Sequence, residues 1–70
     1  MKNTGAALKH LTDRLQTDPE LAWGWHCNIA VPMQDEGVSH EVSNKAAARI
    51  MYNLFRVDTS KNEHYKYKEE

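Results

Sequence analysis

The segment from Leu21 to Met33 constrains the fold most, because it predicts a helix that is apolar on nearly every side. At 100° per residue, one continuous stripe consists of Leu21, Trp25, Ile29 and Met33, widened by Ala22, and the other side carries Trp23, Cys27, Ala30 and Val31. A helix that is apolar nearly all round is normally buried on more than one side. The segment is therefore expected to be the central helix of its domain.

Two amphipathic helices are predicted on either side of this segment. Thr4 can cap the first, over about residues 4–16, because its side-chain oxygen accepts an orphan backbone N–H. Ser39 can cap the third, over about residues 40–56. The apolar residues of the first helix are Leu8, Leu11 and Leu15; those of the third are Val42, Ala46, Ile50 and Leu54, with Ala47 and Met51 beside them. These stripes are predicted to face the core.

The ends of the middle helix carry clear signals. Thr17 and Glu20 have the spacing of a capping box, and Pro19 falls in the first turn, where its missing N–H costs nothing. Gly37 is a natural left-handed terminator, which places the helix over about residues 18–36. Pro32 lies inside this span, so a kink or a break near Ala30 is expected.

These elements predict an all-α fold, a compact three-helix bundle with the second helix at its centre. Its 70 residues suffice for one domain, expected over residues 1–60, with residues 61–70 as a polar tail. Large apolar side chains are few: five Leu, two Ile, four Val and one Phe. A core this small supplies about 3–5 kcal/mol, so self-association or a partner is expected to contribute.

The two tryptophans are predicted to have different roles. Trp25 shares the core stripe of the middle helix and is expected to be structural, whereas Trp23 lies at the centre of the residual apolar face. A second copy of the chain, a different protein or a flat ligand could cover that face. Alternatively, Trp23 packs beneath the polar tail, against Tyr65 or Tyr67.

Several classes of protein are excluded or disfavoured. The sequence contains no run of 18 apolar residues, so no membrane span is expected, and no signal peptide opens the chain. A net charge of −1 argues against a polycation made for nucleic acid, and no sequence-specific nucleic-acid binding is expected. The single Cys27 excludes an intramolecular disulfide.

Metal binding and catalysis are not expected, and neither is a cofactor. The candidate metal ligands are His10, His26, Cys27, His40 and His64. No two of the histidines are four residues apart, and structural zinc needs closely spaced ligand pairs. His26 and Cys27 are adjacent, so on a helix they point about 100° apart and cannot act as base and nucleophile. His26 and Asn28 either find hydrogen-bond partners within the bundle or form hydrogen bonds with the polar edge of a ligand or partner.

The third helix carries a basic strip on the side opposite its predicted core stripe: Lys45, Arg49, Tyr52 and Arg56. Cations beside an aromatic ring can bind phosphates or an acidic protein surface. Glu41 lies on the same side, and a solvated helix face explains the pattern equally. In a nucleotide-binding protein, Trp23 or Trp25 would stack on the base and Arg49 or Arg56 would contact the phosphate.

The stretch from Leu21 to Ala30, LAWGWHCNIA, resembles a segment of small accessory proteins of tailed bacteriophages. In those proteins a helix of the form AWxWHCNIA precedes an Asp-rich turn, a Gly and a helix similar to the NKAAAR run that starts at Asn44. The resemblance covers about residues 18–60. It implies a source class rather than a mechanism, since no settled activity belongs to the motif. Small phage accessory proteins commonly inhibit or redirect host machinery, including anti-phage defence.

Two function classes follow. The first is a non-enzymatic phage-type protein that binds and inhibits or redirects a bacterial host protein, such as a CRISPR complex, in the cytoplasm of the host. The alternative is a helical oligomer that binds or sequesters a nucleotide. The residues expected to contact a partner are Trp23, Cys27, Val31, Lys45, Arg49, Tyr52 and Arg56.

Overall fold

The computed structural model describes residues 4–65 and is built from helices. The elements are α1 (Thr4–Thr17), α2 (Pro19–Asp35), α3 (His40–Phe55) and the short 3-10 helix η1 (Thr59–Lys61). No strand occurs between residues 4 and 65. The predicted all-α three-helix bundle is confirmed, and its helix bounds lie within two residues of those expected from the sequence.

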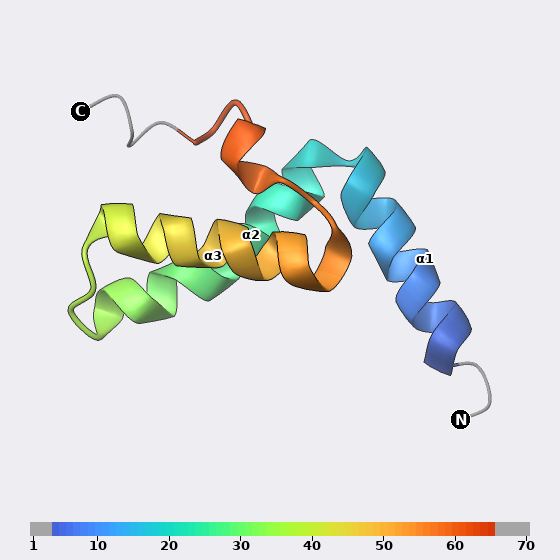
Figure 1. Cartoon of the computed structure of the whole chain (residues 1–70), viewed down its shortest axis with the longest axis horizontal. Helices are drawn as coiled ribbons and strands as arrows, with labels where there is room; N and C mark the ends of the chain where they lie inside the picture. The colour runs from blue at the N-terminus through green and yellow to red at the C-terminus, as the bar shows by residue number, and fades with distance from the viewer. Residues whose placement is uncertain (1–3, 66–70) are drawn as a thin grey trace.

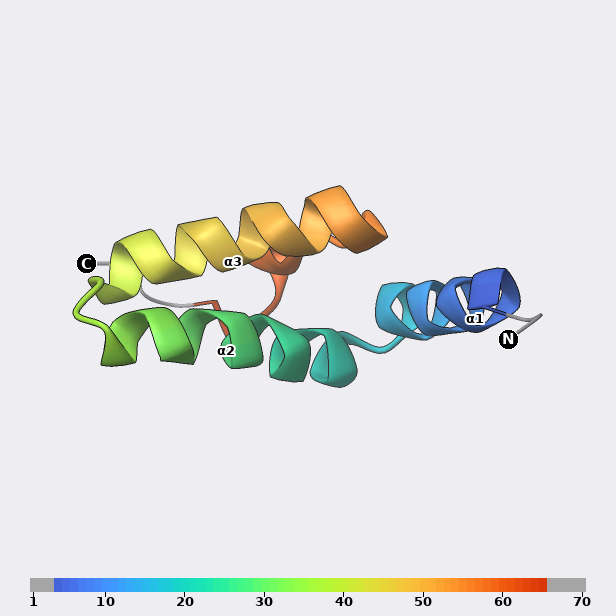
Figure 2. The same cartoon turned by 90° about the horizontal axis from the view of Figure 1, so that it is seen from below.

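The helices α2 and α3 form an antiparallel hairpin that makes up the body of the molecule (Figures 1 and 2). The helix α1 continues beyond the N-terminal end of α2 and projects away from the hairpin (Figure 2). The short η1 follows α3 and lies against both helices of the hairpin. Since α2 packs against α1, α3 and η1, it is the central helix, as predicted.

The start of α2 differs from the prediction in its capping residue. Asp18 is the N-cap, and its Oδ1 accepts a hydrogen bond from the backbone N–H of Leu21 at 3.2 Å. The hydroxyl of Thr17 instead donates to the carbonyl of Asp13 at 3.0 Å, because Thr17 is the last residue of α1. The predicted capping box between Thr17 and Glu20 is therefore wrong.

The predicted stop of α2 is confirmed, but the predicted break is not. Gly37 has φ +102°, the left-handed conformation that favours glycine after a helix. The helix runs unbroken through Pro32 to Asp35. Pro32 falls in the last turn of α2. Its missing N–H therefore affects only the C-terminal end of the helix.

The helix α3 begins at the predicted cap, where Ser39 Oγ accepts a hydrogen bond from the N–H of Val42 at 3.2 Å. It ends one residue earlier than predicted, at Phe55. Arg56 follows in the left-handed region with φ 59°, which turns the chain toward η1.

The predicted core stripes of α2 and α3 are confirmed only in part. Ala22, Ala47 and Met51 are buried as predicted, and Leu21 and Ile29 are half-buried against the core, but other residues of the stripes are exposed. The buried residues are Ala22, His26 and Ala30 on α2 and Ser43, Ala47 and Met51 on α3. Trp25 is 36% exposed, Val42 56% and Leu54 66%. Four of the six buried residues are Ala or Ser, and small side chains allow two helices to approach closely. The larger apolar side chains are thereby displaced to the edges of the contact.

Burial decreases along α1 from its C-terminal end to its N-terminal end. Leu15 is buried together with Ala22 and Met51, Leu11 is half-buried, and Leu8 is 56% exposed. The Gln16 side chain also donates to the carbonyl of Phe55 at 2.9 Å. Only the last two turns of α1 are therefore anchored to the hairpin.

The chain continues to pack beyond residue 60. The Asn62 side chain donates to the carbonyl of Pro19 at 2.9 Å, and Tyr65 is only 7% exposed. The first five residues of the predicted polar tail thus belong to the folded body. Residues 66–70 of that tail, with Tyr67, lie outside the described residues.

Candidate functional site

A fully buried histidine occupies the centre of the hairpin. His26 Nε2 lies 2.7 Å from Asn44 Oδ1, and His26 Nδ1 lies 2.7 Å from Thr59 Oγ1. The Asn44 amide nitrogen donates to the carbonyl of His40 at 2.9 Å, so its Oδ1 is the acceptor that faces the imidazole. His26 Nε2 therefore donates to Asn44, and the Thr59 hydroxyl donates to His26 Nδ1.

This arrangement favours a neutral imidazole. Burial lowers the pKa of His26, and the hydrogen bond to Asn44 opposes that effect only in part. Both ring nitrogens are engaged, so His26 is satisfied within the bundle, the first of the two alternatives from the sequence. Its partners come from α3 and η1. The Asn28 side chain is exposed instead.

An aromatic cluster covers this histidine. The Trp23 ring stacks on His26 with ring centroids 4.3 Å apart and planes 15° from parallel. The Tyr65 ring is nearly perpendicular to both, with its centroid 6.0 Å from that of Trp23 and 5.7 Å from that of His26. The structure thus places Trp23 beneath the C-terminal segment, the alternative to an open face. Trp25, which was expected in the core, is exposed, and its ring is nearly perpendicular to that of Phe55 with the centroids 5.7 Å apart.

Cys27 does not form a nucleophilic centre with its neighbour. Its side chain is half-buried, and burial raises the pKa of the thiol, which disfavours the reactive thiolate. Both nitrogens of the adjacent His26 are hydrogen-bonded to Asn44 and Thr59. The adjacent His26 is thus not available as a base for the Cys27 thiol.

The basic strip lies on the solvent side of α3. Lys45 pairs with Glu41 at 3.1 Å, whereas Arg49 makes no ion pair within residues 4–65. Tyr52 is 51% exposed, and the Arg56 guanidinium carbon lies 5.7 Å from the centre of its ring. The strip therefore presents one aromatic ring between two arginines, neither of which forms an ion pair with a carboxylate of residues 4–65.

Two surface hollows border these residues. One, of about 470 Å³, is lined by Ala48, Arg49, Tyr52, Asn53, Asp58 and Ser60. The other, of about 510 Å³, is lined by Leu15, Gln16, Pro19, Ala22, Arg56, Val57, Asp58, Thr59, Lys61 and Asn62. Asp58 borders both, and its carboxylate accepts from the backbone and hydroxyl of Ser60 as the cap of η1. Sequence reasoning missed both hollows, because they depend on how the segment after α3 folds back.

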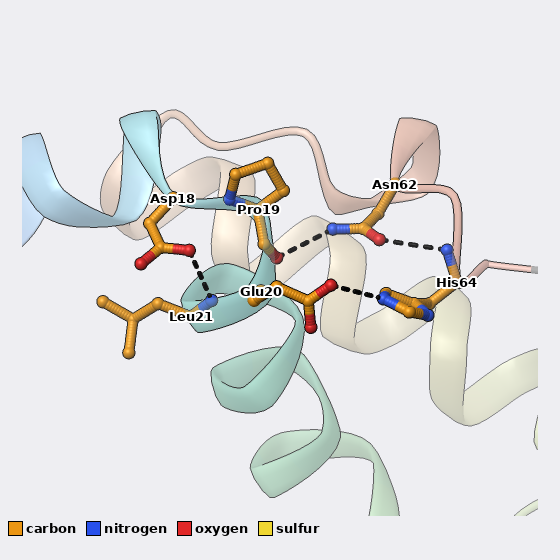
Figure 3. A network of polar contacts seen from close by, with 6 residues as sticks. All are labelled: Asp18, Pro19, Glu20, Leu21, Asn62 and His64. Carbon is orange, nitrogen blue, oxygen red and sulfur yellow. Dashed lines mark hydrogen bonds and ion pairs between the residues drawn. The ribbon is translucent and has the colours of Figure 1, made fainter.

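A polar network joins the start of α2 to the segment after η1 (Figure 3). His64 Nε2 lies 3.0 Å from Glu20 Oε2, and the N–H of His64 donates to Asn62 Oδ1 at 3.0 Å.

Glu63 joins Glu20 and His64 so that their possible ligand atoms lie within 4.8 Å of one another. Carboxylate and imidazole donors suit a divalent transition metal. All three side chains are exposed, and we assign no metal to them. Sequence spacing could not reveal this cluster, because Glu20 is far from the other two in the chain.

The residues predicted to contact a partner fall into two groups. Trp23, Cys27 and Val31 lie on α2, where Trp23 packs against His26 and Val31 is 47% exposed. The basic strip forms the other group, on α3. Of these, the strip is the part that borders a hollow and remains open to solvent.

Comparisons of the chain with protein-family models, with curated proteins and with solved structures give no match. Within residues 4–65, every helix is too short or too polar to span a bilayer.

Proposed function

We propose that this chain is a non-enzymatic, phage-type interaction protein that binds and inhibits or redirects a bacterial host protein in the host cytoplasm. One observation carries the proposal. Tyr52 is half exposed between Arg49 and Arg56, and Arg49 and Tyr52 border a hollow that residues 4–65 leave open. Tyrosine and arginine are the residues that most often dominate the binding energy of protein interfaces.

The charge of the strip indicates the chemistry of the partner. Arg49 has no ion-pair partner in the described part of the chain. The Arg56 guanidinium lies over the Tyr52 ring and donates, at 3.5 Å, to the carbonyls of Tyr52 and Asn53. A partner with carboxylates at matching positions would neutralise both arginines and be steered toward them. We therefore expect an acidic surface on the host protein. A component of an anti-phage defence system, such as a CRISPR complex, is the class of target that the resemblance to phage accessory proteins favours.

A binding role also accounts for the buried polar groups better than catalysis does. His26 is sealed from solvent, and its ring nitrogens are committed to Asn44 and Thr59. The raised pKa of the Cys27 thiol disfavours its use as a nucleophile. The hydrogen bonds of His26 instead hold α2 against α3 and η1, and so support the folded body that carries the basic strip.

The test is a pull-down from bacterial lysate with the double variant Arg49→Glu and Arg56→Glu. We expect the variant to keep its helical content and to lose the captured partner, with the largest loss at low salt. The matched control reverses Lys9 and Arg14 to Glu, two exposed cations on α1 away from the strip. Equal capture by wild type and both double variants would remove the strip from the binding site.

A nucleotide ligand is the second candidate function. The hollow beside Arg49 and Tyr52, about 470 Å³, lies within the range of small-molecule sites. Tyr52, rather than Trp23 or Trp25, is the aromatic that shares it with an arginine. A thermal-shift screen with mononucleotides and cyclic nucleotides tests this function. Stabilisation that disappears in Tyr52→Ala would support it, and no shift with any nucleotide at millimolar concentration would exclude it.

A further inference from the structure

The larger of the two hollows, of about 510 Å³, lies where three segments of the chain meet. Its lining comes from the end of α1, the start of α2 and the segment 56–62, which contains η1. Its volume lies within the range of small-molecule sites. We propose that this hollow binds a small amphipathic carboxylate, whose apolar body lies against the aliphatic lining residues and whose carboxylate is held by Lys61.

The apolar part of the lining is an extension of the core. It consists of Leu15, Pro19, Ala22 and Val57. Leu15 and Ala22 are buried members of the core cluster, and Val57 packs against that cluster. The hollow therefore opens onto the edge of the hydrophobic core. An apolar group that enters it adds to the core and leaves water, which is favourable.

Two side-chain amides hold the walls of the hollow in place. The Gln16 side chain donates to the carbonyl of Phe55 at 2.9 Å and so joins α1 to the end of α3. The Asn62 side chain donates to the carbonyl of Pro19 at 2.9 Å and joins the segment after η1 to α2 (Figure 3). The shape of the hollow is thus set by the fold, so a ligand does not have to order these walls on binding.

The charged residues of the lining define the sign of the ligand. They are two cations, Arg56 and Lys61, and one carboxylate, Asp58, which gives the lining a net charge of +1. The Asp58 carboxylate accepts hydrogen bonds from the N–H and hydroxyl of Ser60, whereas Lys61 forms no ion pair within residues 4–65. A monoanion balances this charge. A dianionic phosphate would exceed it and would lie close to Asp58.

The backbone at Arg56 supports the use of its charge. Its φ of 59° lies in the left-handed region that favours glycine, so keeping a long side chain there costs stability. Strained positions of this kind cluster at functional sites. Arg56 lines this hollow, and its guanidinium lies over Tyr52, which lines the other one. It therefore contributes positive potential on both sides, and the exposed, flexible Lys61 is the group that meets the carboxylate.

The test is a titration of the 15N-labelled chain, followed by two-dimensional NMR, with three probes: 3-phenylpropionate, its neutral amide and acetate. We expect 3-phenylpropionate to shift the backbone N–H resonances of Leu15, Val57 and Lys61 and to saturate at millimolar concentration. The amide should bind about threefold more weakly, because it lacks the charge that Lys61 attracts. Acetate should not saturate, because it lacks the apolar body.

Two variants locate the carboxylate. Lys61→Gln removes the cation, so acid and amide should bind this variant equally. Lys45→Gln is the matched control, because Lys45 is also an exposed lysine but does not line the hollow, and it should keep the threefold difference. The NMR spectra show whether each variant keeps its fold. Lys61 is not part of the basic strip, so a failure here and a failure of host binding give separate signals.

Several results would overturn the proposal. One is the absence of a saturable shift with 3-phenylpropionate at tens of millimolar, and another is equal affinity of wild type for the acid and the amide. Shifts centred on Ala48 and Tyr52 would place the ligand in the other hollow instead. A difference between acid and amide that persists in Lys61→Gln would show that Lys61 does not hold the carboxylate.

Discussion

Trp23 lies flat on His26, with ring centroids 4.3 Å apart and planes 15° from parallel. The imidazole beneath it is hydrogen-bonded to α3 through Asn44 and to η1 through Thr59. The tryptophan thus covers the point where three elements of the fold are joined. Its position indicates a structural role for Trp23 and a peripheral one for Trp25.

The first prediction compares the two tryptophans. Trp23→Ala removes the ring that seals His26 and should lower the free energy of unfolding by about 2–3 kcal/mol, a large fraction of the stability of so small a domain. Trp25→Ala should cost about 1 kcal/mol, since that side chain is already 36% exposed and contacts Phe55 at one edge. Urea unfolding at a dilute protein concentration measures both. A larger loss for Trp25→Ala would reinstate the roles expected from the sequence.

The second prediction concerns pH. Burial lowers the pKa of His26 in the folded chain below its ordinary value of 6.5. The unfolded chain then binds more protons than the folded one below about pH 6.5. The contribution of neutral His26 to the free energy of unfolding is therefore fully present above that pH and is lost as the pH decreases. Urea unfolding at pH 7.5 and 5.0 measures the difference.

The groups that face His26 are Thr59, Asn44, Trp23 and Tyr65, and none of them is a carboxylate that could stabilise the imidazolium. His26→Gln removes the titrating group and should reduce the change in stability between pH 7.5 and 5.0. An unchanged pH dependence in this variant would assign the effect to other groups.

The third prediction isolates one hydrogen bond of His26. Thr59→Val keeps the shape of the buried side chain but removes the hydroxyl that donates to His26 Nδ1. The nitrogen is then buried without a partner, which should cost about 1–3 kcal/mol. Ser60→Ala, which removes the neighbouring hydroxyl on the half-buried side of η1, should cost less. Thermal unfolding followed by circular dichroism compares the two, and equal losses would contradict the assigned network.

The helix bounds could be predicted because they depend on local chemistry. Ser39 caps α3 and Gly37 ends α2 through hydrogen bonds and backbone angles that neighbouring residues decide. The predicted capping box of Thr17 and Glu20 was wrong because Asp18, the next residue, is the N-cap of α2. Thr17 and Asp18 both have side chains suitable for a cap. The Thr17 hydroxyl, however, donates to the carbonyl of Asp13 in α1, and Asp18 accepts from Leu21 N–H.

The buried faces could not be predicted from hydrophobic pattern alone. Since α2 is apolar nearly all round, its pattern does not distinguish the inner side from the outer one. The one available signal was the i+4 spacing of Ala22, His26 and Ala30, matched on α3 by Ser43 and Ala47. Small residues at this spacing permit close helix packing, which favours a narrow contact over burial of the larger side chains. The contacts of His26 with Asn44 and Thr59 depend on that packing and are invisible in the sequence.

The fourth prediction tests the cap of α2. Asp18→Ala removes the carboxylate that accepts from Leu21 N–H and should cost about 1 kcal/mol. Thr17→Ala removes a hydrogen bond to a carbonyl in the last turn of α1 and should cost about 0.5 kcal/mol or less. Chemical unfolding of the two neighbouring variants gives the comparison. A greater cost for Thr17→Ala would restore the capping box.

The last prediction separates stability from function at Arg56. This residue adopts φ 59°, a left-handed conformation that disfavours side chains with a Cβ and suits glycine. Arg56→Gly should therefore raise the free energy of unfolding by about 0.5–1 kcal/mol, whereas Asn53→Gly, within α3, should lower it by about the same amount. If the basic strip binds a host protein, Arg56→Gly should also capture less partner despite its greater stability. A stabilised variant that captures the partner as well as wild type would show that Arg56 only terminates the helix.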